Sequence, residues 1–340
     1  MENVSGSSKW FSLILFLTLT ITGAVNASET DQFYASSAVI KDSSDAINNY
    51  FHKSIKAGIK KANDKDHFIS CREVASNVLT QVLGKFSVKR FVHDKSYSKV
   101  SHFIETSPLI DRFPNDNISS KEYRLGSIYQ RRPFLDNIIG ISKTININGI
   151  YIGGDKIGHF SIIGKTYYKN FLDGLSDGLS AEDAQIKAIK KGFKQETYIL
   201  GYHIGGTFSF ADLEANFQGL TFARNMCEGE NPYLIQRDGK WAPNYANIFD
   251  IRKYINPKMD ESYNISLFTS SLWKKIKGDV VNAYCKNISD PHYLQRSNAY
   301  QYLLTNTIND QLINKFLEDH PSFDRSNQSL NFCSCEKNCK

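Results

Sequence analysis

The sequence predicts a mainly α fold, a helical globular domain with a small β hairpin. Apolar residues recur at helical spacing in most segments, Ser or Asp residues stand where these segments begin, and one segment alternates apolar and polar residues around Asn148-Gly149. The 340 residues are 41% hydrophobic and include 8 prolines, which suffices for a buried core and excludes a disordered or collagen-like chain.

The charge balance is mildly basic, with 41 Lys+Arg against 35 Asp+Glu and a net charge of +6. The excess is spread along the chain, and no basic stripe with interleaved aromatic residues occurs. We therefore expect no nucleic-acid partner. Phosphate loops, dinucleotide fingerprints and serine-nucleophile motifs are absent from the sequence, so we expect no cofactor.

The first residues have the order of a secretory signal peptide. Lys9 precedes the run FSLILFLTLTITGA, and small residues follow up to Ala27. This run is shorter than the ~20 residues that span a bilayer, which favours cleavage near Ala27 over the alternative of an uncleaved anchor. We expect a periplasmic or secreted protein whose mature form has no stable membrane span.

Three segments are expected along the chain. Residues 1–27 form the signal peptide, residues 28–150 an N-terminal helical region ending in the hairpin, and residues 151–340 a helical core domain with the candidate site and a disulfide-stapled C-terminal tail. The polar residues 28–44 are expected to be loosely packed.

The N-terminal region has two helical patterns. One amphipathic helix runs past Tyr50 and Ile59, and Ser70 is a candidate cap for a second helix that ends near Gly84. Residues 141–154 then alternate Ile with polar residues around Asn-Gly, the strongest hairpin signal in the chain.

Three helices are expected after the hairpin. The first begins at Asp155, whose carboxylate can cap backbone N–H groups. The second follows Ser180 and runs to about His203, and the third follows Ser209 and runs to about Met226. Short loops join the three, so we expect them to be neighbours in space.

Six cysteines suit an exported chain: Cys71, Cys227, Cys285, Cys333, Cys335 and Cys339. Three lie in the body and three in the tail, so the tail is expected to be held to the body by disulfides, although sequence cannot choose among the 15 pairings. A zinc site in the tail is the alternative, but its CSCEKNC pattern lacks paired two-residue spacings.

Four polar residues on the three helices form the candidate site: His159, Glu196, Asp212 and Asn216. His159 lies one turn from a helix start, where the helix dipole favours a neutral imidazole, and Glu196 is an acid within an apolar stretch. Asp212 and Asn216 share a face with Gly219 and Ala223, a small-residue surface on which another helix can pack closely. Each residue also has a structural interpretation, as a core histidine, a solvent-facing acid or a capping acid.

These residues resemble a known motif order. The chain contains GGDKIGHF, then an acid about forty residues later, and then FSFADLEANFQG. This order is similar to the Asp-Lys-x-x-His, Glu, Ser-x-x-Asp-Leu-x-Ala-Asn-x-x-Gly order of VanZ-like membrane proteins and YfiM-like periplasmic lipoproteins. Exported bacterial proteins with the same pattern resemble the chain as well. The match covers about a fifth of the chain. The resemblance implies a cell-envelope setting and the motif residues Asp155, Lys156, His159, Glu196, Asp212, Asn216 and Gly219. The chain lacks the membrane helices of the first family and the lipid-attachment Cys of the second.

Three functions are open at this point. The first is a hydrolase of peptidoglycan or another envelope glycan, in which Glu196 is the general acid and Asp212 or Asp260 stabilises or activates the attacking species. The envelope glycan or lipid substrate would be positioned by His159, Asn216, Asp155 and Lys156. The second is a non-catalytic envelope protein in which the same residues form a structural network. The third is a metal-dependent hydrolase using His159, Glu196 and Asp212, although no tight His-x-x-x-His pair occurs. Exposure to a cleft favours chemistry, and full burial favours structure.

Overall fold

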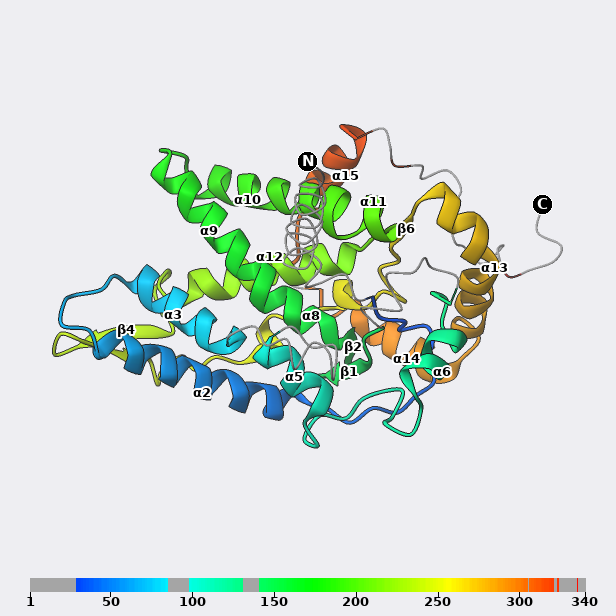
Figure 1. Cartoon of the computed structure of the whole chain (residues 1–340), viewed down its shortest axis with the longest axis horizontal. Helices are drawn as coiled ribbons and strands as arrows, with labels where there is room; N and C mark the ends of the chain where they lie inside the picture. Colours follow the sequence, from blue (N-terminus) through cyan, green and yellow to red (C-terminus); the bar gives the residue numbers. More distant parts are fainter. Residues whose placement is uncertain are drawn as a thin grey trace, which may run out of the picture.

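The computed structural model describes residues 29–84, 98–130, 141–304, 306–320, 323 and 335. Within these residues the protein is mainly α-helical, as predicted, with three small antiparallel strand pairs (Figure 1). The N-terminal helices are α2 (Ser44–Asn63), α3 (Cys71–Leu83), α5 (Lys99–Thr106) and α6 (Ser120–Gly126).

The two predicted N-terminal helices are confirmed. Ser70 caps α3 in a capping box with Glu73. The helix ends at its C-cap Gly84, whose φ of 64° is a conformation that glycine adopts readily and other residues rarely do. The prediction of a loosely packed segment over 28–44 is wrong for its first described part, because residues 29–33 are all buried. The Asp31 carboxylate accepts a hydrogen bond from the distant backbone N–H of Ile128, a contact that holds this segment against the body.

The predicted hairpin is confirmed as β1 (Thr144–Ile147) and β2 (Ile150–Gly153). Asn148 and Gly149 form its two-residue turn, and both have the positive φ that such a turn requires, 54° and 83°. The hairpin leads directly into α8 (Gly154–Gly158), so it fixes where the following helix begins.

That helix starts without the expected cap. Gly153 is the N-cap and no side chain caps the helix, because the Asp155 carboxylate is bound instead to Thr30 and Lys156. The helix continues through a π-helical turn, η2 (His159–Ile163), into α9 (Gly164–Ser176).

The second helix is interrupted before His203. α10 (Ala181–Gln195) passes into a π-helical turn, η3 (Glu196–Leu200), and a break at Gly201 separates it from α11 (Tyr202–Gly205). A Cβ at Gly201 would lie 2.2 Å from Glu196 Oε1, so the break brings bare backbone onto that carboxyl. The third helix, α12 (Phe210–Asn225), begins after Ser209 as predicted.

The close approach predicted for the small-residue face of α12 is confirmed. α9 and α12 cross at the centre of the molecule, and a Cβ on Gly219 would lie 1.9 Å from the Phe160 carbonyl oxygen and 2.8 Å from Gly164 Cα (Figure 1). This crossing brings the first turns of α8 and α12 together.

The remaining elements surround this centre. They are β3 (Thr207–Phe208), β4 (Leu234–Arg237), β5 (Lys240–Pro243), η4 (Ile251–Lys253), η5 (Pro257–Met259), β6 (Leu267–Phe268), α13 (Ser270–Asn287), α14 (Pro291–Tyr300) and α15 (Asp310–Glu318). The main hydrophobic cluster includes residues from both sides of position 150, from Ile47 on α2 to Phe316 on α15. The β4–β5 hairpin lies beside α2, and α15 lies beside α10 (Figure 1).

Two disulfides join distant parts of the chain. Cys285 pairs with Cys335, which confirms that the tail is bonded to the body and removes Cys335 from any zinc site. Cys71 pairs with Cys227 across 156 positions of sequence, within the body. Cys333 and Cys339 lie outside the described residues. Among the described helices, none combines the length and apolar character needed to cross a membrane.

Candidate functional site

Lys156 is the centre of a buried polar cluster. Its ammonium Nζ lies 2.7 Å from Asp155 Oδ2, Asp212 Oδ1 and Glu261 Oε1, and its side chain is 0% exposed. Burial by itself lowers the pKa of Lys156, but the three carboxylates outweigh it and hold that pKa well above its ordinary value. The side chain is therefore a fixed positive charge.

Asp212 also contacts His159. His159 Nε2 lies 3.4 Å from Asp212 Oδ2, and His159 Nδ1 lies 3.2 Å from Asn216 Oδ1. An Nδ1–H that donates to the amide oxygen leaves Nε2 facing the carboxyl group. Asn216 thus orients the imidazole, and the imidazole together with Lys156 orients Asp212.

Glu196 joins the cluster from η3. It is 2% exposed, its Oε1 atom lies 3.5 Å from the Ser209 backbone nitrogen, and no described residue hydrogen-bonds to its Oε2 atom. Ser209 is the N-cap of α12 and its hydroxyl accepts from the Asp212 backbone N–H. In a capping box, the acid at position 212 would accept a hydrogen bond from the Ser209 backbone N–H. Here Glu196 faces that N–H instead, and the Asp212 side chain binds Lys156.

Two carboxyl groups in the cluster have raised pKa values. Burial, reinforced by the charge of Asp212, holds the pKa of Glu196 well above its ordinary value. Burial also raises the pKa of Asp212 to about 8, because Asp155 and Glu261 add to it and Lys156 only partly offsets it. One ammonium cannot neutralise four buried carboxylates, so the excess negative charge raises the pKa of Glu196 and of Asp212.

The acidic segment after η5 contributes Glu261 and not the predicted Asp260. Asp260 is 0% exposed and its carboxylate accepts from Ser262 N and Oγ and from the Tyr300 hydroxyl, contacts that hold this turn against α14. Glu261 instead accepts from Lys156 and from the Ser209 hydroxyl at 2.9 Å.

The structure thus brings together most of the residues predicted from the sequence. Asp155, Lys156, His159, Asp212 and Asn216 are linked by direct contacts, and Glu196 reaches the same helix start through Ser209. Ser209 and Thr30 belong to the cluster but were not predicted as site residues, and of the two adjacent acids the prediction chose Asp260 and not Glu261. The Ser-x-x-Asp motif includes Ser209 and could have indicated it, whereas no pattern distinguished Glu261 from Asp260.

The two site helices change their hydrogen-bond pattern where site residues begin. The π-helical turns η2 and η3 start at His159 and at Glu196. Such turns are rare in proteins and are frequent at functional sites. Their coincidence with two motif residues on separate helices is an observation independent of the polar contacts.

Part of the cluster has the geometry of a cation site. Asp155, His159 and Asp212 each offer one atom, and these atoms lie within 4.8 Å of one another. Lys156 Nζ already lies at 2.7 Å from both carboxylates, so the positive charge between them is supplied by the chain itself. Glu196 is not a member of this group, which therefore differs from the ligand set predicted from the sequence.

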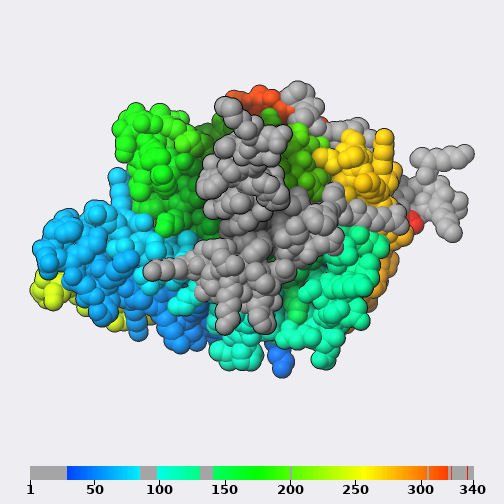
Figure 2. Space-filling view, in the orientation of Figure 1, coloured from blue at the N-terminus to red at the C-terminus, as the bar shows by residue number. Residues whose placement is uncertain are grey.

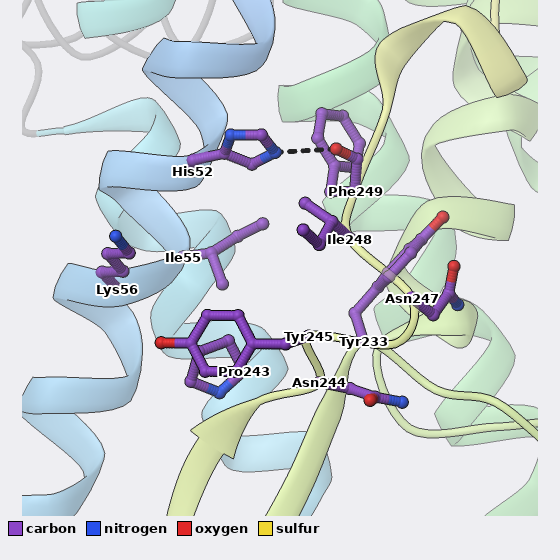
Figure 3. A pocket seen from close by; sticks show the side chains of 10 residues that line it. All are labelled: His52, Ile55, Lys56, Tyr233, Pro243, Asn244, Tyr245, Asn247, Ile248 and Phe249. Atoms are coloured by element: carbon purple, nitrogen blue, oxygen red, sulfur yellow. Dashed lines mark hydrogen bonds between the residues drawn. The ribbon is translucent and has the colours of Figure 1, made fainter.

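A surface pocket lies away from this cluster, between α2 and residues 233–249 (Figure 3). It has a volume of about 160 Å³, and His52 Nε2 lies 2.7 Å from the Phe249 carbonyl oxygen on one of its walls. Figure 3 shows tyrosine, proline and isoleucine side chains around the opening. None of its lining residues belongs to the predicted site.

Comparison with known proteins adds no identity: no family model, curated protein or solved structure matches the chain.

Proposed function

We propose that the protein is an exported hydrolase of an envelope glycan, with Glu196 as the proton donor and Asp212 as the proton acceptor. The observation that carries this proposal is the state of Glu196. It is a buried carboxyl group with a raised pKa and one oxygen to which no described residue hydrogen-bonds, near a second carboxyl group whose pKa is also raised. Paired carboxyl groups of this kind supply the acid and the base of glycoside hydrolysis.

The roles follow from the protonation states. Protonated Glu196 donates its proton to the oxygen of the leaving sugar, and ionised Asp212 accepts a proton from the attacking water. Lys156 Nζ binds Asp212 Oδ1, and His159 Nε2 faces Asp212 Oδ2 at 3.4 Å. Asp212 ionises as the pH rises through about 8, so the rate is expected to rise over the same range.

Substrate must reach Glu196 past the segment 201–206. Gly201 covers the carboxyl group, and Gly205 and Gly206 end the short helix that follows. Glycine at these positions leaves the backbone free to change conformation, so displacement of this segment is the step that would admit substrate.

A structural network is the second candidate function, and the complete burial of the cluster favours it. Satisfied networks in protein interiors pair their members, however, and an ionisable side chain with an unpartnered oxygen is destabilising. Glu214 illustrates the contrast: it is buried on the opposite side of α12, and its carboxylate accepts from Gln218, Asn256 and the Ile308 N–H. Glu196 lacks that set of partners.

A metal-dependent hydrolase is the third candidate, favoured by the group Asp155, His159 and Asp212. It requires Lys156 to leave the position between the two carboxylates. A chelator tests it directly, since the acid–base proposal expects activity to persist in EDTA.

Export is part of the proposal. The two disulfides suit a protein that folds in an oxidising compartment, and the signal-peptide pattern precedes them in the sequence. N-terminal sequencing of the protein recovered from the periplasm or medium is expected to begin near residue 28, and a chain that retained Met1 would contradict the cleavage.

The function is tested by release of soluble fragments from purified peptidoglycan. Wild type should release fragments, and Glu196→Gln should reduce the rate by roughly 10²–10⁴-fold, the usual contribution of a general acid. Glu228→Gln is the control, because it removes the half-buried ion pair with Arg224, away from the cluster, and should leave the rate unchanged. Absence of release by wild type, or equal rates for wild type and Glu196→Gln, would overturn the proposal.

A further inference from the structure

We propose that η3 and α11 form a docking surface for an anionic lipid bilayer. The apolar part of this surface is Tyr198, Ile199 and Ile204, and lysines of α10 form its basic margin. The inference concerns a surface and goes beyond the proposed hydrolase, on which it does not depend.

The apolar side chains are exposed together. Tyr198 and Ile199 are each 51% exposed and Ile204 is 46% exposed. The Tyr198 ring stacks on His203 with ring centroids 5.2 Å apart, which brings the η3 and α11 residues onto one surface. α11 reaches the outside of the molecule beside α15, in the upper part of Figure 2. Large side chains exposed in a group, unlike single ones, indicate a surface that is covered in function.

The neighbouring helix is basic. From Ala184 to Gln195 the sequence contains Lys187, Lys190, Lys191 and Lys194 and no acid. Lys190 and Lys194 precede Tyr198 by eight and four residues, which places the three on one helix face, and both lysines are exposed. Lys187 forms an ion pair with Asp177, so its charge is not counted in the basic margin.

Charges on α15 must be counted as well, because that helix packs against α10. It carries exposed Lys315 and Glu318, and exposed Asp319 follows its last residue, while its exposed first residue, Asp310, is paired with Lys258. Apart from the Asp310–Lys258 pair, two acids stand against four exposed lysines, at positions 190, 191, 194 and 315, so the surface has a net positive charge. A bilayer rich in anionic lipids is its electrostatic complement.

The combination favours a bilayer over a protein partner. Lysine is depleted in protein–protein interfaces, whereas interfacial segments place lysines beside the headgroups and aromatic or aliphatic side chains at the acyl boundary. Tyr198 has the amphipathic ring that such an interface prefers. Three apolar side chains are also few for a stable dimer interface, which typically uses about 20–30 residues a side.

Docking would bring the lipid surface close to Glu196. Tyr198 is two residues from Glu196, and Gly201 between the exposed side chains covers the Glu196 carboxyl group. A bilayer bound here therefore contacts the segment that must move for substrate to enter.

The experiment is co-sedimentation of the purified protein with vesicles of phosphatidylglycerol and phosphatidylethanolamine, compared with vesicles of phosphatidylcholine alone. Wild type should bind the anionic vesicles and bind less as salt rises, because surface charge attraction is screened. The triple variant Tyr198→Ser/Ile199→Ser/Ile204→Ser should lose more than about tenfold in affinity, since each lost side chain removes apolar area from the bilayer. Lys190→Gln/Lys191→Gln/Lys194→Gln should remove the preference for anionic lipid.

The matched control is Val39→Ser/Leu109→Ser/Leu125→Ser, three exposed apolar residues elsewhere on the molecule. It should bind as wild type does, and all three triple variants should show the wild-type circular dichroism spectrum. The proposal is overturned if wild type does not sediment with anionic vesicles, or if the η3–α11 variant and the control variant lose affinity equally. It is also overturned if wild type is a dimer that the η3–α11 variant converts to a monomer, because a second copy would then occupy the surface.

Discussion

Replacement of Lys156 by Met removes the positive charge that three carboxylates share while it retains most of the side-chain volume. Removing one partner of a buried ion pair typically costs about 3–5 kcal/mol of stability, because the other charge is left uncompensated. Here Asp155, Asp212 and Glu261 all lose a partner at 2.7 Å, so the free energy of unfolding should fall by at least ~3 kcal/mol at pH 7.

The loss should depend on pH with a defined sign. Without the ammonium, the folded variant holds protons on carboxyl groups that are ionised in the unfolded chain, so its stability falls as pH rises. The deficit relative to wild type should therefore shrink between pH 7 and pH 5. Urea denaturation followed by tryptophan fluorescence measures this at each pH.

The control for this measurement is Lys187→Met, which removes an exposed ion pair with Asp177 and should leave stability unchanged within error. A loss below about 1 kcal/mol for Lys156→Met at pH 7 would mean that the ammonium does not neutralise these carboxylates.

Two further predictions concern packing and proton binding. Gly219→Ala places a methyl group 1.9 Å from the Phe160 carbonyl oxygen and should destabilise the fold by more than about 2 kcal/mol in urea denaturation. The control is Gly278→Ala on α13, where nothing lies within 4 Å of the added Cβ, and it should be neutral or stabilising by up to ~1 kcal/mol. Equal effects of the two substitutions would contradict the close crossing of α9 and α12. Because the pKa of Asp212 is raised to about 8, this group binds more protons in the folded protein than in the unfolded chain between pH ~4 and about 8. The free energy of unfolding of wild type should therefore fall as pH rises over this range, and Asp212→Asn should make its slope against pH shallower by up to ~1.4 kcal/mol per pH unit. An unchanged slope would contradict the raised pKa.

Local sequence signals predicted the elements that depend on local chemistry. The Asn148-Gly149 turn, the Ser70 and Ser209 caps and the small residue at Gly219 each act through neighbouring backbone, and the structure has them as expected. The helical spacing of His159, Asp212 and Asn216 likewise placed them on faces that meet.

The failures occurred where long-range contacts decide the outcome. The Asp155 carboxylate was expected to cap its own helix, but Thr30 and Lys156 bind it more favourably than the local backbone does. The polar segment from residue 29 is buried because Asp31 and its neighbours find partners far away in the sequence. Glu261 lies in an irregular turn, where no periodicity indicates which of two adjacent acids faces the cluster.

Difference infrared spectroscopy of wild type against Glu196→Gln at pH 7 tests the central claim most directly, because the carbonyl stretch of a protonated carboxyl group is separate from the bands of an ionised one. The account predicts that wild type has a protonated-carboxyl band that the variant lacks, since burial and Asp212 hold the pKa of Glu196 well above its ordinary value. Loss of carboxylate bands alone in the variant would show that Glu196 is ionised, and it would contradict the assignment of this residue as the acid.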